Sequence, residues 1–196
     1  MERKQITMLC NTDRQTLLNL ARESIQFGLT HGQPPTVKKQ SYTTDLQQPR
    51  ASFVTLHTQG KLRGCIGSLE AHQALVNDIA SNAFNAAFRD PRFPSLQADE
   101  LDKLHIHIEI LTPPEPIQFS SEQDLLEQLQ PGKDGLILNE GTHRGTFLPT
   151  VWETLPKAEQ FLLHLKNKAG LPGDYWSNTI KVQRYHTESF EEEPAS

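Results

Sequence analysis

The spacing of apolar residues predicts two helices in the first half of the chain. Helical spacing runs through "DRQTLLNLARESIQFGL" after Thr12, which can cap the helix, and Gly32 with Pro34 then ends it. The same spacing returns in "EAHQALVNDIASNAFNAAF", which ends at Asp90 before Pro91. Residues 31–50 are polar and show no clear period, so we expect a long surface loop there.

Alternation with a period of two predicts the strands. The run "ASFVTLHTQGKLRGCI" predicts a hairpin with its turn at residues 58–60, and "LHIHIEIL" predicts a half-buried strand that "TPPEP" ends. A second hairpin is expected in "GLILNEGTHRGTFLP", with its turn at residues 139–141. The segment "NTIKVQRYH" predicts a closing strand.

Two more helices are expected in the second half, one in "SSEQDLLEQLQPGKDG" and one over residues 156–168. Strands joined by tight turns pair antiparallel, so the order of elements predicts an α+β fold with antiparallel sheets and flanking helices. The acidic end "EEEPAS", residues 191–196, is expected to be a flexible tail.

Composition narrows the class of protein. With 196 residues, 36% of them hydrophobic and a net charge of −5, the chain can form one globular domain over 1–196, or two small lobes, without a disulfide. Its apolar stretches are too short for a membrane span, and "MERKQITMLCNTD" has no apolar signal-peptide core, so we expect a cytoplasmic protein. No basic run is present, which argues against independent binding of nucleic acid.

One of the two cysteines offers the main chemical candidate. In the second strand of the first hairpin, Arg63 and Cys65 share one face, and an arginine beside a thiol favours the thiolate. Three interpretations stay open: a small buried residue in a turn that needs glycine, a surface that binds a ligand or partner, or a nucleophile. A nucleophile needs an acid or base within reach, for which Glu109 and His143 are the candidates.

A metal site is the next candidate. His105, His107 and Glu109 share one face of the predicted strand, and two imidazoles with a carboxylate could hold zinc or ferrous iron. Any half-solvated strand shows the same alternation, however, so the sequence predicts no metal and no cofactor.

Two loop segments complete the candidates. Asp90, Arg92 and Phe93 in "FRDPRFPSL" can form a rigid loop tied by an ion pair between Asp90 and Arg92. His143 and Arg144 lie at the second hairpin turn, where Arg144 could bind an anion or simply meet solvent.

Four segments together resemble the AMMECR family: "FVTLHTQGKLRGCIGSLEA", "AAFRDPRFPSL", "IEILTPPEPI" and "GLILNEGTHRGTFLPTVWETLPKAEQFLLHLKNKAGLPGDYW". The resemblance runs in order over residues 12–185, and its hexapeptide "LRGCIG" is highly specific. It resembles in particular the A component of the bacterial and archaeal AmmeMemoRadiSam system. It implies a two-lobed α+β fold, in which a larger lobe carries residues 62–67 and a smaller lobe packs against it. It also implies two partners, a Memo-like protein and a radical SAM enzyme.

The motif residues are carried over by position. The matching set is Leu62, Arg63, Gly64, Cys65, Ile66, Gly67, Asp90, Pro91, Arg92, Phe93, Glu109, Leu148 and Pro149. His105 and His107 do not belong to the family pattern, and Ala51-Ser52 replaces a small pair that commonly contains glycine. Two hypotheses follow: an accessory binding component of a modification system, or a thiol-dependent enzyme that uses Cys65 with the help of Arg63.

Overall fold

The computed structural model describes residues 8–193, which form two compact units. One unit comprises the chain up to residue 111 together with the segment from residue 188, and the other comprises residues 112–187. No helix within residues 8–193 has the length and apolar character needed to cross a membrane. The α+β class with antiparallel sheets is confirmed.

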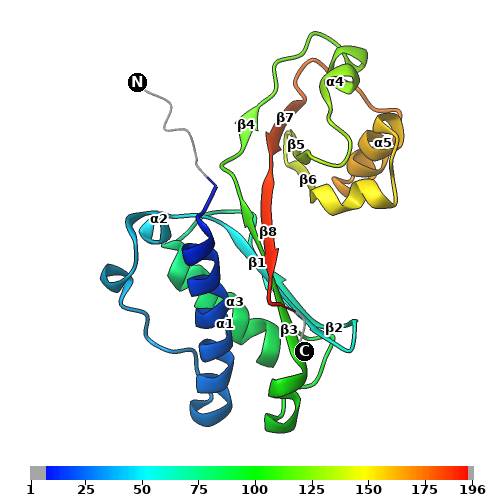
Figure 1. Ribbon diagram of the computed structural model, residues 1–196. Helices are drawn as coiled ribbons and strands as arrows, with labels where there is room; N and C mark the ends of the chain where they lie inside the picture. Colours follow the sequence, from blue (N-terminus) through cyan, green and yellow to red (C-terminus); the bar gives the residue numbers. More distant parts are fainter. Residues whose placement is uncertain (1–7, 194–196) are drawn as a thin grey trace. The chain divides into compact units, whose positions relative to one another are not determined.

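The first unit contains one sheet and three α-helices (Figure 1). The helices are α1 (Asn11–His31), α2 (Thr44–Gln47) and α3 (Leu75–Phe88), with short 3-10 turns η1 (Lys39–Ser41) and η2 (Ala98–Lys103). The strands are β1 (Ser52–Thr58), β2 (Lys61–Gly67), β3 (Leu104–Leu111) and β8 (Thr187–Glu191), in the spatial order β2-β1-β3-β8. The edge strand β2 contains the whole hexapeptide.

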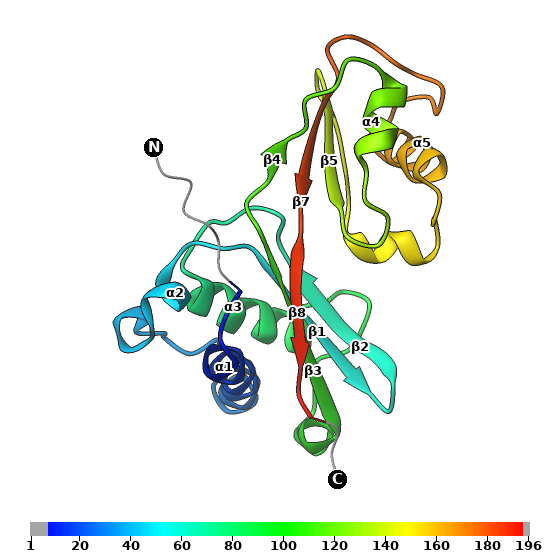
Figure 2. The ribbon, with the colours of Figure 1, turned by 45° about the horizontal axis from the view of Figure 1, so that its top comes forward.

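The two faces of this sheet differ because side chains alternate along each strand. Alternate positions of β1 and β3, among them Val54, Leu56 and Ile108, are fully buried in the core with residues of α1 and α3. Both helices lie on this side of the sheet in Figures 1 and 2. The intervening positions are polar for the most part, as the alternation in "LHIHIEIL" predicted, and they form the outer face of the sheet.

The first hairpin is confirmed, and its turn consists of Gln59 and Gly60. Both residues have positive φ, 51° and 75°, as a type I′ hairpin turn requires. The segment expected to be a loop over 31–50 is more structured than predicted, since it contains η1 and α2. Leu46 of α2 is buried in the core, which explains why this stretch keeps helical structure despite its polar sequence.

The second unit contains the other sheet, with the spatial order β4-β7-β5-β6. Its strands are β4 (Glu115–Pro116), β5 (Gly135–Glu140), β6 (His143–Phe147) and β7 (Lys181–Tyr185). Its helices are α4 (Glu122–Gln128) and α5 (Ala158–Lys168), with the 3-10 turn η3 (Pro149–Glu153). Ser121 caps α4 by accepting a hydrogen bond from the Asp124 amide, as the sequence predicted.

The turn of the second hairpin was predicted two residues too early. Asn139 and Glu140 belong to β5, and the turn begins at Gly141, whose φ is +58°. Glu140 is held in the strand because its buried carboxylate accepts hydrogen bonds from Tyr175, Ser177 and Thr179. These partners lie far along the chain, so the local pattern could not indicate them.

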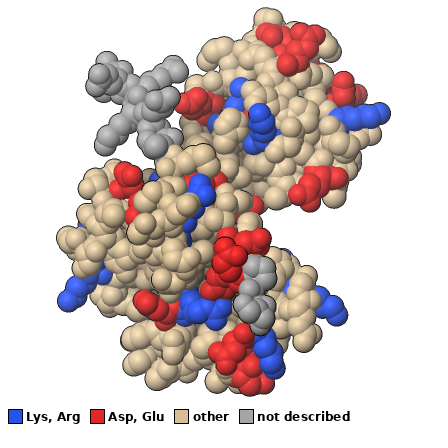
Figure 3. All heavy atoms as spheres, viewed as in Figure 1, with Lys and Arg blue, Asp and Glu red and all other residues tan. Residues whose placement is uncertain are grey.

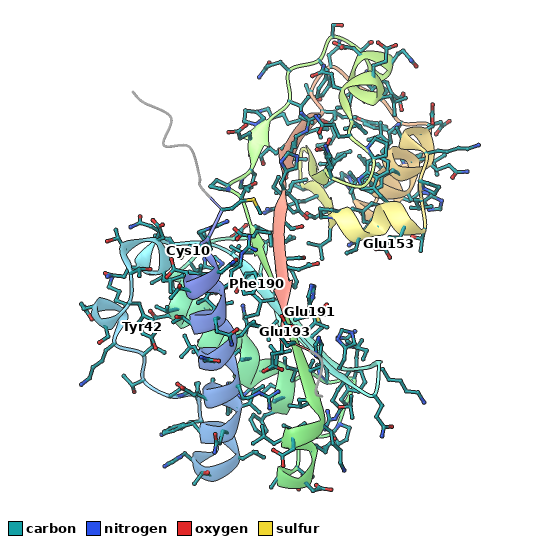
Figure 4. All side chains as sticks on the ribbon, in the orientation of Figure 1. Cys10, Tyr42, Glu153, Phe190, Glu191 and Glu193 are labelled. Atoms are coloured by element: carbon teal, nitrogen blue, oxygen red, sulfur yellow. The ribbon has the colours of Figure 1, made fainter. Side chains whose placement is uncertain are left out.

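The predicted flexible tail is wrong for its first residues. Glu191 ends β8, and the Glu192 carboxylate accepts two hydrogen bonds of 2.7 Å from the Arg22 guanidinium. Figure 4 labels Phe190, Glu191 and Glu193 at this end of the chain. Residues 194–196 of the predicted tail lie outside the described residues. The acidic composition suggested exposure, but a cation 170 positions earlier anchors Glu192.

Candidate functional site

The hexapeptide forms the last six residues of β2, and Cys65 lies in the strand, not in the turn at Gln59 and Gly60. Cys65 is half-buried within the strand, and α3 begins only at Leu75, so Cys65 does not lie in a turn that needs glycine. A Cβ at Gly64 would lie 2.1 Å from the carbonyl oxygen of Ala86 in α3. A Cβ at Gly67 would lie 2.4 Å from the Phe53 ring. The glycines are therefore explained by close packing, and neither needs a positive φ.

Arg63 is engaged within its own unit. Its Nε donates to Glu100 Oε1 at 2.8 Å, and its Nη2 donates to Glu100 Oε2 at 3.1 Å and to the carbonyl oxygen of Pro94 at 2.9 Å. The hydrogen bonds from Arg63 lower the pKa of Glu100. The Arg63 guanidinium thus forms a bidentate pair with the Glu100 carboxylate. That Arg63 assists the Cys65 thiol stays a prediction.

Asp90 and Arg92 form the predicted ion pair and hold the backbone of Cys65. Asp90 Oδ2 accepts from the Cys65 amide at 2.9 Å and from Arg92 Nη2 at 2.7 Å. Arg92 Nη2 also donates to the Cys65 carbonyl oxygen at 3.3 Å. The hydrogen bonds from Arg92, aided by those from backbone amides, hold the pKa of Asp90 well below its ordinary value.

The Asp90–Arg92 pair, which we call the Asp90 clamp, covers part of an exposed strand edge. Because β2 lies at the edge of its sheet, every second amide and carbonyl along it has no strand to pair with. At Cys65 both groups are occupied by Asp90 and Arg92, so another strand cannot pair there. The same edge presents Leu62, which is 41% exposed, and the Arg92 side chain, which is 54% exposed.

The outer face of the sheet places Cys65 beside Thr55. The two residues are directly opposite each other on β2 and β1, and Thr55 Oγ1 donates to Cys65 Sγ at 3.2 Å. On the far side of Thr55 lies His107 of β3. Glu109 is opposite Phe53, one row further along, and one strand separates it from β2. The hairpin register was the signal that could have indicated Thr55 as the neighbour of Cys65.

The histidines of this face are arranged around Glu191 of β8. His105 is opposite His57, and its Nε2 lies 2.9 Å from Glu191 Oε2. The hydrogen bond with His105 lowers the pKa of Glu191, and the charges of His105, His107 and His57 add to this effect. Among residues 8–193, no group of three or more His, Cys, Asp or Glu side chains is arranged to hold a metal ion.

His143 and Arg144 belong to the second unit. His143 Nδ1 lies 3.0 Å from the carbonyl oxygen of Ala169, and Arg144 is opposite Asn139 in the sheet. Their roles as acid, base or anion ligand stay predictions. In Figure 3, basic and acidic side chains are interspersed over the visible face of each unit, and the blue atoms do not merge into one extended basic area.

Comparison with known proteins agrees with this architecture. The sequence model of the AMMECR1 family matches residues 18–190. The chain belongs to the AMMECR1 family. A relative from Methanocaldococcus jannaschii, named Protein MJ0810, is 39% identical over 161 residues, which cover 78% of each chain. A relative from Methanothermobacter thermautotrophicus is 36% identical over 191 residues, covering 94% of this chain and 97% of its own.

The family fold is also known from a crystal structure. The uncharacterized protein PH0010 from Pyrococcus horikoshii is similar with a TM-score of 0.74 and 35% sequence identity, over 91% of this chain and 90% of that one. The resemblance predicted from the hexapeptide and the later motifs is therefore confirmed. The AMMECR1 match includes all six residues of the hexapeptide, as well as Asp90 and Arg92.

Proposed function

We propose that this AMMECR1-family chain is a cytoplasmic binding component that docks a Memo-like protein and a radical SAM enzyme in a modification system. The partners are those that the resemblance of the motifs implies. The observation that carries the proposal is that three charged residues of the motifs, Arg63, Asp90 and Arg92, are held by partners inside the first unit. Arg63 is bound to Glu100, and Asp90 with Arg92 clamps Cys65. Such residues build a rigid surface.

The proposed docking surface is the outer edge of β2, formed by Leu62, Arg92, Phe93 and Pro94, which we call the signature edge. The Arg92 guanidinium lies over the Phe93 ring, 5.5 Å from its centroid, and Arg63 ties Pro94 to the strand. An exposed leucine, an arginine and an aromatic ring along one edge suit a partner surface that combines apolar and acidic groups. Asp90 holds the Arg92 guanidinium in place before any partner binds, which lowers the entropic cost of docking.

Binding to purified Memo-like and radical SAM proteins from the same genome tests this proposal. Leu62→Asp puts a charge on the signature edge without removing an internal hydrogen bond, and we expect it to weaken binding about tenfold or more. Leu163→Asp is the matched control, because Leu163 is 42% exposed on α5 in the other unit. Equal affinities for the two variants and the unmodified chain, measured by biolayer interferometry, would contradict the signature edge as the docking surface.

A thiol-dependent activity of Cys65 is the second candidate, and the hydrogen bond from Thr55 favours it. A hydroxyl that donates to sulfur stabilises the thiolate, the form that acts as a nucleophile. His107, next to Thr55 on β3, is the nearest imidazole in the row of residues that crosses the sheet through Cys65. This candidate predicts that Cys65 carries a covalent adduct during turnover.

Alkylation distinguishes the two candidates. Cys10, which precedes α1 and is exposed, is the internal reference (Figure 4). If Cys65 is a nucleophile, iodoacetamide at neutral pH modifies it faster than Cys10 in the folded chain, and Thr55→Val slows it. Mass spectrometry of each peptide measures the two rates. Faster modification of Cys10 counts against the thiol enzyme and leaves the binding component as the function.

A further inference from the structure

The second unit contains a crevice of about 510 Å³ beside β7, lined by residues 116–119, residues 180–183, Asn139 and Asn178. We propose that this crevice binds a small molecule that joins a planar, hydrogen-bonding ring to an anionic group, as a nucleoside monophosphate does. The site is independent of the proposed docking function, because every lining residue belongs to the second unit and the signature edge belongs to the first.

The crevice arises from the brevity of β4. That strand pairs with β7 over two residues, Glu115 and Pro116, and the Ile117 amide then donates a last hydrogen bond of 2.9 Å to the carbonyl oxygen of Val182. Beyond Ile117 the chain leaves the sheet, so the side of β7 near Lys181 opens. A volume of about 510 Å³ falls in the usual range for small-molecule sites.

Four primary carboxamides line this crevice, those of Gln118, Asn139, Asn178 and Gln183. Each offers two N–H donors and one carbonyl acceptor. Within residues 8–193, no side-chain hydrogen bond engages any of the four. Paired donors and acceptors of this kind match the edge of a heterocyclic base, as the pairing of asparagine and glutamine with adenine illustrates.

The charge of the lining favours an anion. Lys181 is exposed and faces the same side of the sheet as Asn139, its direct neighbour on β5. The residues that line the crevice include no aspartate and no glutamate, so no carboxylate of the lining competes for the ammonium group. A phosphate or carboxylate group beside Lys181 would form a charge-assisted hydrogen bond.

Phe119 supplies the surface for a planar ring. It is half-buried, and its ring lies 5.6 Å from that of Trp176 with an interplanar angle of 53°. This contact restricts the rotation of Phe119 and leaves part of the ring on the crevice. Stacking on an aromatic side chain is possible for any base, since every base has a π-face.

Titration of the full chain with adenosine monophosphate, followed by ¹⁵N–¹H NMR, tests the site. We expect saturable shifts at the amides of residues 117–119 and 180–183, with weaker binding of adenosine and of inorganic phosphate, each of which lacks one half of the ligand. Lys181→Gln should weaken binding about tenfold. Lys133→Gln, at an exposed lysine of the same unit outside the crevice, should leave the affinity unchanged.

Three results would overturn the inference. The first is that the monophosphates of adenosine, guanosine and uridine all fail to shift these amides up to millimolar concentrations. The second is that Lys181→Gln and Lys133→Gln bind adenosine monophosphate with equal affinity, which would show that Lys181 does not contact the anionic group. The third is binding of inorganic phosphate as tight as that of the nucleotide, which would show that the ring is not recognised.

Discussion

At the scale of single residues, Asp90 holds the backbone of the hexapeptide without belonging to it. Its side chain is 1% exposed, and its two oxygens accept four hydrogen bonds, one from Cys65 and three from Arg92. A buried carboxylate with this many donors stays charged at low pH. The geometry of Cys65 therefore depends on the ionised state of a residue 25 positions later.

The free energy of unfolding of the chain should depend on the ionisation of Asp90 at acidic pH. The depressed pKa means that Asp90 stabilises the folded state fully above its ordinary unfolded value of about 4, and that this contribution is lost as the pH falls toward the folded pKa. We expect Asp90→Asn to be less stable at neutral pH and to show a flatter pH dependence between about pH 4 and 2. Urea denaturation across this range measures it.

Asp174→Asn is the control for this prediction, because Asp174 is exposed in the second unit. Its free energy of unfolding should follow that of the unmodified chain at every pH. If the free energy of unfolding falls equally with pH in Asp90→Asn and in the unmodified chain, the ionised Asp90 carboxylate does not stabilise the fold.

At the scale of elements, the contact between α3 and β2 explains why the hexapeptide contains glycine at its centre. The helix approaches the strand so closely at Gly64 that the Ala86 carbonyl fills the space of a side chain. Neighbouring positions of α3 are small as well, with Ala83 and Ala87 buried in the same core. The glycine at the centre of the hexapeptide thus packs against an alanine-rich face of α3.

Gly64→Ala should destabilise the first unit by about 2–3 kcal/mol, because the new methyl group meets backbone that cannot move aside alone. Chemical denaturation measures the loss in free energy of unfolding. Gly173→Ala is the matched control: the nearest atom to its Cβ would be Leu163 Cγ at 2.9 Å, in an exposed side chain that can move aside. Equal stabilities for the two variants would contradict close packing as the reason for Gly64.

At the scale of the whole molecule, the chain forms two hydrophobic cores. One contains Leu17, Ile79 and Ile108, and the other contains Leu138, Phe161 and Leu165. In the second core the Phe161 ring stacks on Trp152 at 3.8 Å and meets Phe147 edge-on at 5.3 Å. Each core belongs to one unit, so a cavity in one core should lower the stability of mainly that unit.

Phe161→Ala should therefore cost about 3–5 kcal/mol in the second unit and reduce amide protection in β5 and β7. We expect the amides of α3 and β3 in the first unit to keep most of their protection in hydrogen exchange followed by mass spectrometry. Ile79→Ala, in the first core, should give the reverse pattern. Loss of protection throughout the chain in both variants would show that the two units unfold as one.

Most elements could be predicted from the sequence because their signals are local. The period of two in "FVTLHTQ" and "LHIHIEIL", the turn at Gln59-Gly60 and the serine cap at Ser121 depend on neighbours within a few positions. The α+β class and the common face of His105, His107 and Glu109 follow from the same periods. The family resemblance rests likewise on short runs of residues, above all "LRGCIG".

The partners of the candidate residues depended on the tertiary structure. The pairing of Arg63 with Glu100, the clamp of Asp90 on Cys65 and the bond between Arg22 and Glu192 join positions 37, 25 and 170 residues apart. A period or a cap carries no information about such distances, since packing brings these groups together. For this reason the local pattern identified Cys65 as the residue of interest, and only the packed fold showed that its backbone is clamped and that Arg63 is held by Glu100.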